Sequence, residues 1–162
     1  MEIKKQGNIY ALTAKIKLPI ALNTAWDFLS DPGNLKLITP DYMGFHITSD
    51  LNDKMYSGQI ISYKVSPLLG VKLNWVTEIT HVEKPLYFVD EQRFGPYALW
   101  HHKHFLKEID GGVEMIDVVH YKLPLSLLSN NFHSILVEPK LKQIFSYRSG
   151  VLHELFGTYV GA

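Results

Sequence analysis

The sequence contains no cysteine. Disulfide bonds, thiolate nucleophiles and thiolate-bound zinc are therefore excluded. An excess of either charge is also missing, because 16 Lys and Arg residues balance 16 Asp and Glu residues. Without a net positive field, we expect no general attraction to nucleic acid or to an anionic membrane.

Long apolar segments are absent too. No uncharged apolar stretch approaches the ~20 residues that a membrane-spanning helix needs, and the amino-terminal "MEIKKQGNIY" has no apolar run after its lysines. We therefore expect a cytoplasmic protein without stable insertion into a membrane. The 162 residues contain no linker-like segment, which predicts a single domain over residues 1–162.

Aromatic residues, in contrast, are plentiful, with 3 Trp, 9 Tyr and 8 Phe. Aromatic side chains offer a large apolar area with few rotatable bonds, so they suit a packed core and the wall of a binding cavity equally well. Composition alone does not choose between these two uses.

Alternation of apolar and polar residues predicts that most of the chain is β-strand. The first such run is residues 8–19, which ends at Pro19. Two short helices are expected next, one capped by Asn23 and ending before Pro32, the other ending before Pro40. Six further strand-like runs follow, separated by Gly, Pro and Asp residues: 44–51, 58–66, 71–83, 87–94, 98–109 and 113–124.

The carboxy-terminal segment changes to the period of a helix. From Pro139 to a stop at Gly157, apolar residues recur along one face. A meander of antiparallel strands must bury its apolar face, and this helix is the only predicted element large enough to cover it. We expect an α+β fold: a curved, seven-stranded antiparallel sheet around the long carboxy-terminal helix, with two short helices after the first strand and a hollow between the layers.

Several strings, taken in order, resemble a known superfamily. They are "LPIALNTAWDFLSDPGNLKLITP", the tryptophan of "LNWVTEI", "FVDEQRFGPYALWHHKHF", "DGGVEMIDVVHYKLPL" and "IFSYR", and they extend over nearly the whole chain. The chain is similar to START and Bet v 1-like helix-grip proteins of the polyketide cyclase/dehydrase and lipid transport type, and among these to a bacterial ligand-binding group. The resemblance implies a helix-grip fold with a cavity for an apolar small molecule. It implies no particular reaction, because members include carriers, sensors and enzymes.

Parity along the strands separates residues that face the expected hollow from those that face solvent. A two-residue turn at Asp110 and Gly111 pairs Ile109 with Gly112. A three-residue loop would shift this register by one residue and reverse the faces. With the two-residue turn, the inner face collects Trp100, His102, His104, Asp117, Val119 and Tyr121.

A cation interrupts the apolar face of the closing helix. Arg148 follows Ile144 by four residues, so it must either reach the rim or find a carboxylate, and Asp90 and Asp117 are the candidates. The "YR" of this helix also belongs to the pattern of the superfamily. An aromatic wall with a small polar cluster is typical of a small-molecule site. The predicted ligand-binding residues are Trp75, Phe88, Asp90, Gln92, Trp100, His102, His104, Asp117, Val119, Tyr121, Ile144 and Arg148.

Three functional hypotheses follow. The leading one is reversible binding of an apolar or amphipathic small molecule, lipid-, polyketide- or aromatic-like, whose polar end meets the polar residues. The alternative is a cyclase, dehydratase or isomerase in which His102, His104 and Asp117 are the catalytic acid and base residues. The third is a protein-interaction module that uses a sheet edge or a lid formed by residues 123–138, a segment we otherwise expect to be a loop and a short helical turn.

A metal ion is a further option for the histidines, since His102, His104 and Asp117 would supply two imidazoles and a carboxylate. We expect no metal and no cofactor, because Arg148 nearby disfavours a cation and the resembling superfamily is not known for metals. The remaining histidines are expected on the surface or in loops: His81, His101, His120, His133 and His153.

Overall fold

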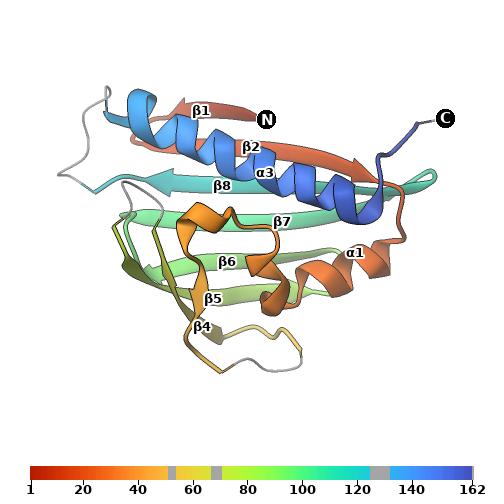
Figure 1. Ribbon diagram of the computed structural model, residues 1–162, viewed down its shortest axis with the longest axis horizontal. Helices are drawn as coiled ribbons and strands as arrows, with labels where there is room; N and C mark the ends of the chain where they lie inside the picture. The colour runs from red at the N-terminus through yellow and green to blue at the C-terminus, as the bar shows by residue number, and fades with distance from the viewer. Residues whose placement is uncertain (51–53, 67–70, 125–131, 162) are drawn as a thin grey trace.

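The computed structural model of the protein describes residues 1–50, 54–66, 71–124 and 132–161. One antiparallel sheet curves around a long carboxy-terminal helix (Figure 1). The strands are β1 (Glu2–Gln6), β2 (Ile9–Leu18), β3 (His46–Ile47), β4 (Gln59–Val65), β5 (Leu73–Glu83), β6 (Tyr87–Phe94), β7 (Leu99–Ile109) and β8 (Gly112–Lys122). Their order across the sheet is β1-β2-β8-β7-β6-β5-β4-β3.

The helical elements cover the concave face of this sheet. They are α1 (Leu22–Leu29), the 3₁₀ turns η1 (Pro32–Lys36) and η2 (Asp41–Met43), the π-helical turn η4 (His133–Val137) and α3 (Glu138–Phe156). In Figure 1, α3 lies across β2 and β8, whereas the helical turns that follow α1 lie over the β6 and β7 side. Among the described residues, no helix is both long and apolar enough to cross a membrane.

Within the described residues, the sheet has eight strands rather than the predicted seven. The additional strand is β1, which forms a hairpin with β2 through a turn in which Gly7 has a φ of 61°. Only Ile3 of its five residues is partly buried. Because Ile3 is the one residue of this edge strand that packs against the core, its sequence has no apolar alternation, and periodicity could not reveal it.

The start of α1 also differs from the prediction. The residue before its first turn is Ala21, no side chain caps the helix, and Asn23 lies inside it. The buried residues of α1 are Ala25 and Trp26. Packing of these two side chains against the sheet therefore stabilises the helix in place of the expected cap.

The long helix α3 confirms the predicted closing helix. Pro139 lies in its first turn, and the amide of Gly157 donates to the carbonyl of His153 at its end. Its buried residues recur every three or four positions, on the face toward the sheet: Leu141, Phe145, Arg148 and Leu152. The cation is thus inside the apolar face, as its sequence position indicated.

The hairpin of β7 and β8 has the predicted register. Gly111 takes a φ of 70°, which a two-residue hairpin turn requires, and Ile109 pairs with Gly112. His104 is then opposite Asp117, and the same register sets His102 opposite Val119 and Trp100 opposite Tyr121. Along β8, every second residue from Val113 to Tyr121 is buried, so the face chosen from parity is the inner one.

Candidate functional site

Five polar residues meet inside the molecule, and we call them the polar cluster. Asp90 comes from β6, His102 and His104 from β7, Asp117 from β8 and Arg148 from α3. Four of them are buried, and Asp90 is partly buried. Four neighbouring elements therefore deliver charged or titratable groups to one place, where the surrounding protein is apolar.

The polar cluster separates two apolar clusters. On β8, Asp117 lies between Met115, which belongs to one apolar cluster, and Val119, which belongs to the other. On α3, the arginine of the polar cluster lies in the same way between Phe145 and Leu152. The inner face of the fold is thus apolar at both ends and polar across the middle.

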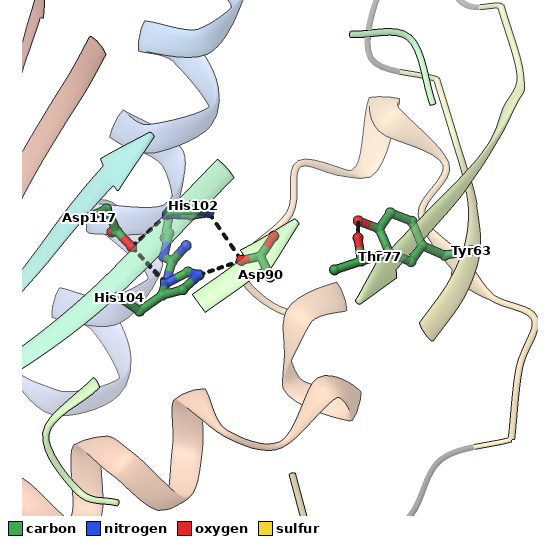
Figure 2. Close-up of polar contacts among 7 residues, drawn as sticks. Tyr63, Thr77, Asp90, His102, His104 and Asp117 are labelled. Carbon is green, nitrogen blue, oxygen red and sulfur yellow. Dashed lines mark hydrogen bonds and ion pairs between the residues drawn. The ribbon is translucent and has the colours of Figure 1, made fainter. Parts of the chain in front are cut away.

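Carboxylates and imidazoles alternate around a closed ring (Figure 2). Oδ2 of Asp90 lies 2.8 Å from Nε2 of His104 and 3.5 Å from Nδ1 of His102. Oδ1 of Asp117 lies 3.0 Å from Nε2 of His102 and 2.8 Å from Nδ1 of His104. The last contact is an ion pair whose direction does not suit a hydrogen bond.

The strand register accounts for this ring. Asp90 pairs with His102 across β6 and β7, and Asp117 pairs with His104 across β7 and β8. Each carboxylate therefore reaches one imidazole directly opposite and the other diagonally, distances at which cross-strand side chains interact. The ring closes because the two histidines are two residues apart on the middle strand and point to the same face.

Arg148 joins the ring from the helix. Its Nη2 lies 3.6 Å from Oδ1 of Asp117, which confirms the expectation that this buried cation meets a carboxylate. The buried Nε of Arg148 has no hydrogen-bond partner in the described part of the chain, and neither has the buried Nε1 of Trp75. Buried donors without partners are rare and costly.

Burial and neighbouring charges together set the ionisation of the two carboxyl groups. Burial raises the pKa of Asp117, but Arg148 and the two imidazoles outweigh burial and hold this pKa well below its usual value. Burial also acts against the ionised form of Asp90, and the same positive groups again lower the net pKa. Both carboxyl groups are therefore ionised at neutral pH.

The pKa values of the two imidazoles shift in opposite directions. Burial and the nearby His104 lower the pKa of His102. Burial acts on His104 as well, but its contacts with Asp117 and Asp90 outweigh burial and raise its pKa. The shifts favour the neutral form of His102 and the charged form of His104, and in that form His104 and Arg148 balance the two carboxylates.

A cavity of about 190 Å³ adjoins the polar cluster. Residues of β4, β5, β6 and β7 form one wall, and residues of α1, η1 and α3 form the opposite side. The hollow expected between sheet and helices is therefore present. Eight of the predicted residues line it: Trp75, Phe88, Asp90, Trp100, His102, His104, Ile144 and Arg148.

The other four predicted ligand-binding residues do not line the cavity, which corrects their placement. Val119 and Tyr121 face inward as predicted, but both are fully covered within an apolar cluster. Asp117 is not among the lining residues, and its Oδ1 contacts both imidazoles. The side-chain amide of Gln92 donates to the carbonyl of Tyr97, and its oxygen accepts from the Tyr97 amide, so it holds its own hairpin together.

A second polar point in the cavity wall was missed from the sequence. The hydroxyl of Tyr63 on β4 lies 2.9 Å from Oγ1 of Thr77 on β5, and both residues line the cavity (Figure 2). Burial and the charge of Asp90 raise the pKa of Tyr63, which keeps its hydroxyl neutral. Alternation from Trp75 places Thr77 on the inner face, and this was the signal available.

His133 was wrongly expected on the surface or in a loop. It is buried in η4, where its ring stacks on Tyr10 at 3.6 Å between centroids and its Nε2 lies 2.8 Å from the Tyr121 hydroxyl. The turn η4 confirms the short helical turn expected within residues 123–138. The idea of a lid also involves residues 125–131, which lie outside the described residues.

A concave sheet closed by one long helix, with a cavity between the two, defines the helix-grip class of proteins. The particular form found here is the Bet v 1/START-like helix-grip fold. No family model and no curated protein matches the sequence, so the comparison depends on solved structures.

Three solved structures illustrate the likeness. Protein Ms6760 from Mycobacterium smegmatis is 18% identical over 96% of this chain and 96% of its own, with a TM-score of 0.63. Ara h 8.0201 is 14% identical over 90% of this chain and 99% of its own, with a TM-score of 0.58. Major latex-like protein 151 from Panax ginseng is 7% identical over 93% of this chain and 99% of its own, with a TM-score of 0.65. At these identities the likeness establishes the fold alone.

Proposed function

We propose that the protein reversibly binds an apolar or amphipathic small molecule in the cavity, with the polar end of the molecule at the polar cluster. The observation that carries this proposal is the combination of an apolar cavity with one polar wall. Asp90, His102 and His104 face that cavity, and the unpartnered donors of Trp75 and Arg148 belong to residues that line it. A ligand oxygen that accepts from such a donor would remove the cost of leaving it unpaired.

The size of the cavity limits the ligand. At about 190 Å³ it is somewhat larger than the ~150 Å³ engineered cavity that binds benzene. We therefore propose a compound of one or two rings, or a short acyl chain, with a single polar end. Burial of roughly 200 Å² of apolar ligand surface would contribute on the order of 5 kcal/mol before the costs of binding.

Binding of 2-naphthol, with naphthalene as a matched probe without the hydroxyl group, tests this function. Isothermal titration and amide chemical shifts report affinity and location. We expect 2-naphthol to bind more tightly than naphthalene and to shift the amides of β6 and β7. Ile144→Phe places a larger side chain in the cavity and should abolish binding. Ile116→Phe, on the outer face of β8, should leave binding unchanged. Equal binding to both variants would contradict the proposal.

One observation favours a second candidate, acid–base catalysis in the same cavity. His102 and His104 are adjacent, yet their pKa values shift in opposite directions, and groups pushed apart in this way can divide the roles of base and acid. The reaction would be the proton transfer of a cyclase, dehydratase or isomerase. His102 would take a proton from the carbon beside a ligand carbonyl, and His104 would stabilise the resulting enolate oxygen.

Hydrogen–deuterium exchange of 2-tetralone in D₂O, followed by proton NMR, measures this step without knowledge of the natural substrate. We expect exchange that is faster than in buffer and is lost in His102→Gln while binding of 2-naphthol is kept. Exchange at the rate of buffer alone would reject the catalytic candidate and leave the binding proposal intact.

A further inference from the structure

Three potential metal ligands of the polar cluster converge on one point. Asp90, His102 and His104 each offer one ligand atom, and these atoms lie within 4.8 Å of one another. We propose that they form a binding site for a divalent first-row transition-metal ion, with coordination positions open toward the cavity. The proposal goes beyond ligand binding, and either can fail without the other.

The positions of the ring nitrogens support this ligand set. Nδ1 of His102 and Nε2 of His104 both face Oδ2 of Asp90, at 3.5 and 2.8 Å. Ligands about 2.0–2.1 Å from a tetrahedral ion lie about 3.3 Å from each other. Of the two spacings to Asp90, one is thus slightly longer and the other shorter than a metal requires, and all three ligand atoms lie within 4.8 Å of one another. Side-chain rotations that bring the two nitrogens toward a common centre would admit the ion.

The opposite nitrogens of both rings are held by one carboxylate. Oδ1 of Asp117 lies 3.0 Å from Nε2 of His102 and 2.8 Å from Nδ1 of His104. Histidines that bind metals usually donate their other N–H to such a carboxylate, which orients the ring and strengthens the ligand. Nε2 of His102 is placed to donate in this way, whereas Nδ1 of His104 meets Asp117 as an ion pair only. The sequence suggested Asp117 as the third metal ligand; in the structure Asp90 has that position and Asp117 is the supporting carboxylate.

Arg148 is compatible with this arrangement. Its nearest carboxylate is the supporting Asp117, at 3.6 Å, and no ion pair joins it to Asp90 among the described residues. The presence of Arg148 near the histidines therefore does not exclude a metal ion at Asp90, His102 and His104. The negative charge of Asp117, which contacts Arg148 and both imidazoles, would offset part of the repulsion between the two positive charges.

The ligand chemistry selects the kind of ion. Two imidazoles and one carboxylate suit Zn²⁺, Fe²⁺, Co²⁺ or Cu²⁺, whereas Mg²⁺ and Ca²⁺ require mostly oxygen ligands. The three ligand residues line the cavity, so an open coordination position would be available to an oxygen atom of a bound small molecule. A metal there would act as the polar anchor of the cavity.

Zn²⁺ and Co²⁺ are the probes for the test. Untagged protein is treated with a chelator, dialysed and titrated by calorimetry, and the visible absorption of Co²⁺ reports its coordination. The background for every measurement is His101→Gln with His120→Gln, because these outer-face rings lie 6.4 Å apart and could bind metal adventitiously. We expect one equivalent of Zn²⁺ to bind in this background, with four- or five-coordinate Co²⁺ absorption.

Three variants in the same background decide the assignment. Asp90→Asn and His104→Gln should weaken Zn²⁺ by at least ~100-fold, and Asp117→Asn by ~10–100-fold as expected for a supporting carboxylate. Circular dichroism without metal verifies that each variant is folded, and Asp90→Asn preserves side-chain shape. Loss of all binding on removal of His101 and His120, or unchanged affinity in Asp90→Asn, would overturn the proposal. Binding of 2-naphthol to the metal-free protein, prepared with the chelator, tests the organic ligand separately.

Discussion

The two arginines, Arg93 and Arg148, rank in opposite order by the length of their shortest ion pair and by burial. Nε of Arg93 lies 2.6 Å from Oε2 of Glu78, but its side chain is 43% exposed. Nη2 of Arg148 lies at the longer distance of 3.6 Å from Asp117, but its side chain is only 10% exposed. If burial dominates, Arg148→Met destabilises the fold far more than Arg93→Met does.

The size of the loss in unfolding free energy follows from the buried charge that Arg148→Met leaves without its partner. Removal of one partner of a buried ion pair costs about 3–5 kcal/mol, because the other charge stays buried without compensation. Asp117 keeps its contacts with His102 and His104, so we expect the lower end, about 3 kcal/mol. For a domain of this size that corresponds to a fall of roughly 6–12 °C in Tm.

Urea denaturation at pH 7, followed by tryptophan fluorescence and circular dichroism, measures both variants. Arg93→Met is the control, since exposed ion pairs are screened by water and contribute little. A free energy of unfolding that falls equally in Arg93→Met and Arg148→Met would refute the reasoning that the polar cluster is an electrostatically coupled unit. Metal-free protein is used, so that ligand effects do not enter.

Three further predictions concern single residues. His104 has a raised pKa in the folded state. The stabilisation from its charge is therefore fully present below its usual pKa and is lost as pH rises through the folded pKa. In urea titrations, the difference in unfolding free energy between the metal-free protein and His104→Gln should shrink from pH 6 to pH 9. Gly150→Ala, in the middle of α3 where an added Cβ meets no atom, should raise stability by about 0.5–1 kcal/mol, and an unchanged urea midpoint would contradict this. Gly112→Ala should lower stability instead, because its Cβ would collide with the carbonyl oxygen of Leu18, and the same urea titration distinguishes the two glycines.

Parity and turn chemistry predicted the inner face correctly for a physical reason. A two-residue turn at Asp110 and Gly111 permits a single register, and that register determines the face of every residue on β7 and β8. The Asp117 side of the ring follows from this register, whereas the Asp90 side also requires the register between β6 and β7. Local rules therefore sufficed to bring His104 and Asp117 together.

The extent of the cavity could not be predicted by the same rules. Val119 and Tyr121 share their face with His102, yet both are packed in an apolar cluster that includes Val137 and Phe145. The segments that cover them are distant in sequence. A local sequence pattern therefore cannot show which inward-facing residues are packed in the core and which line the cavity. The edge strand β1 and the buried His133 were missed for the same reason: tertiary contacts, or their absence, decide both.

The polar cluster and the cavity are easier to explain together than separately. A buried set of charges is weak evidence for stability, since well-packed apolar residues often replace one without loss. A cluster that served packing alone would be expected to use all its donors internally. Here the buried Nε of Arg148, a member of the cluster, has no partner among the described residues, and neither has the buried Nε1 of Trp75 outside it; both residues line the cavity. A polar group that entered that space and accepted from these donors would satisfy them, so we infer that the cost of leaving them unpaired is offset when the cavity is filled.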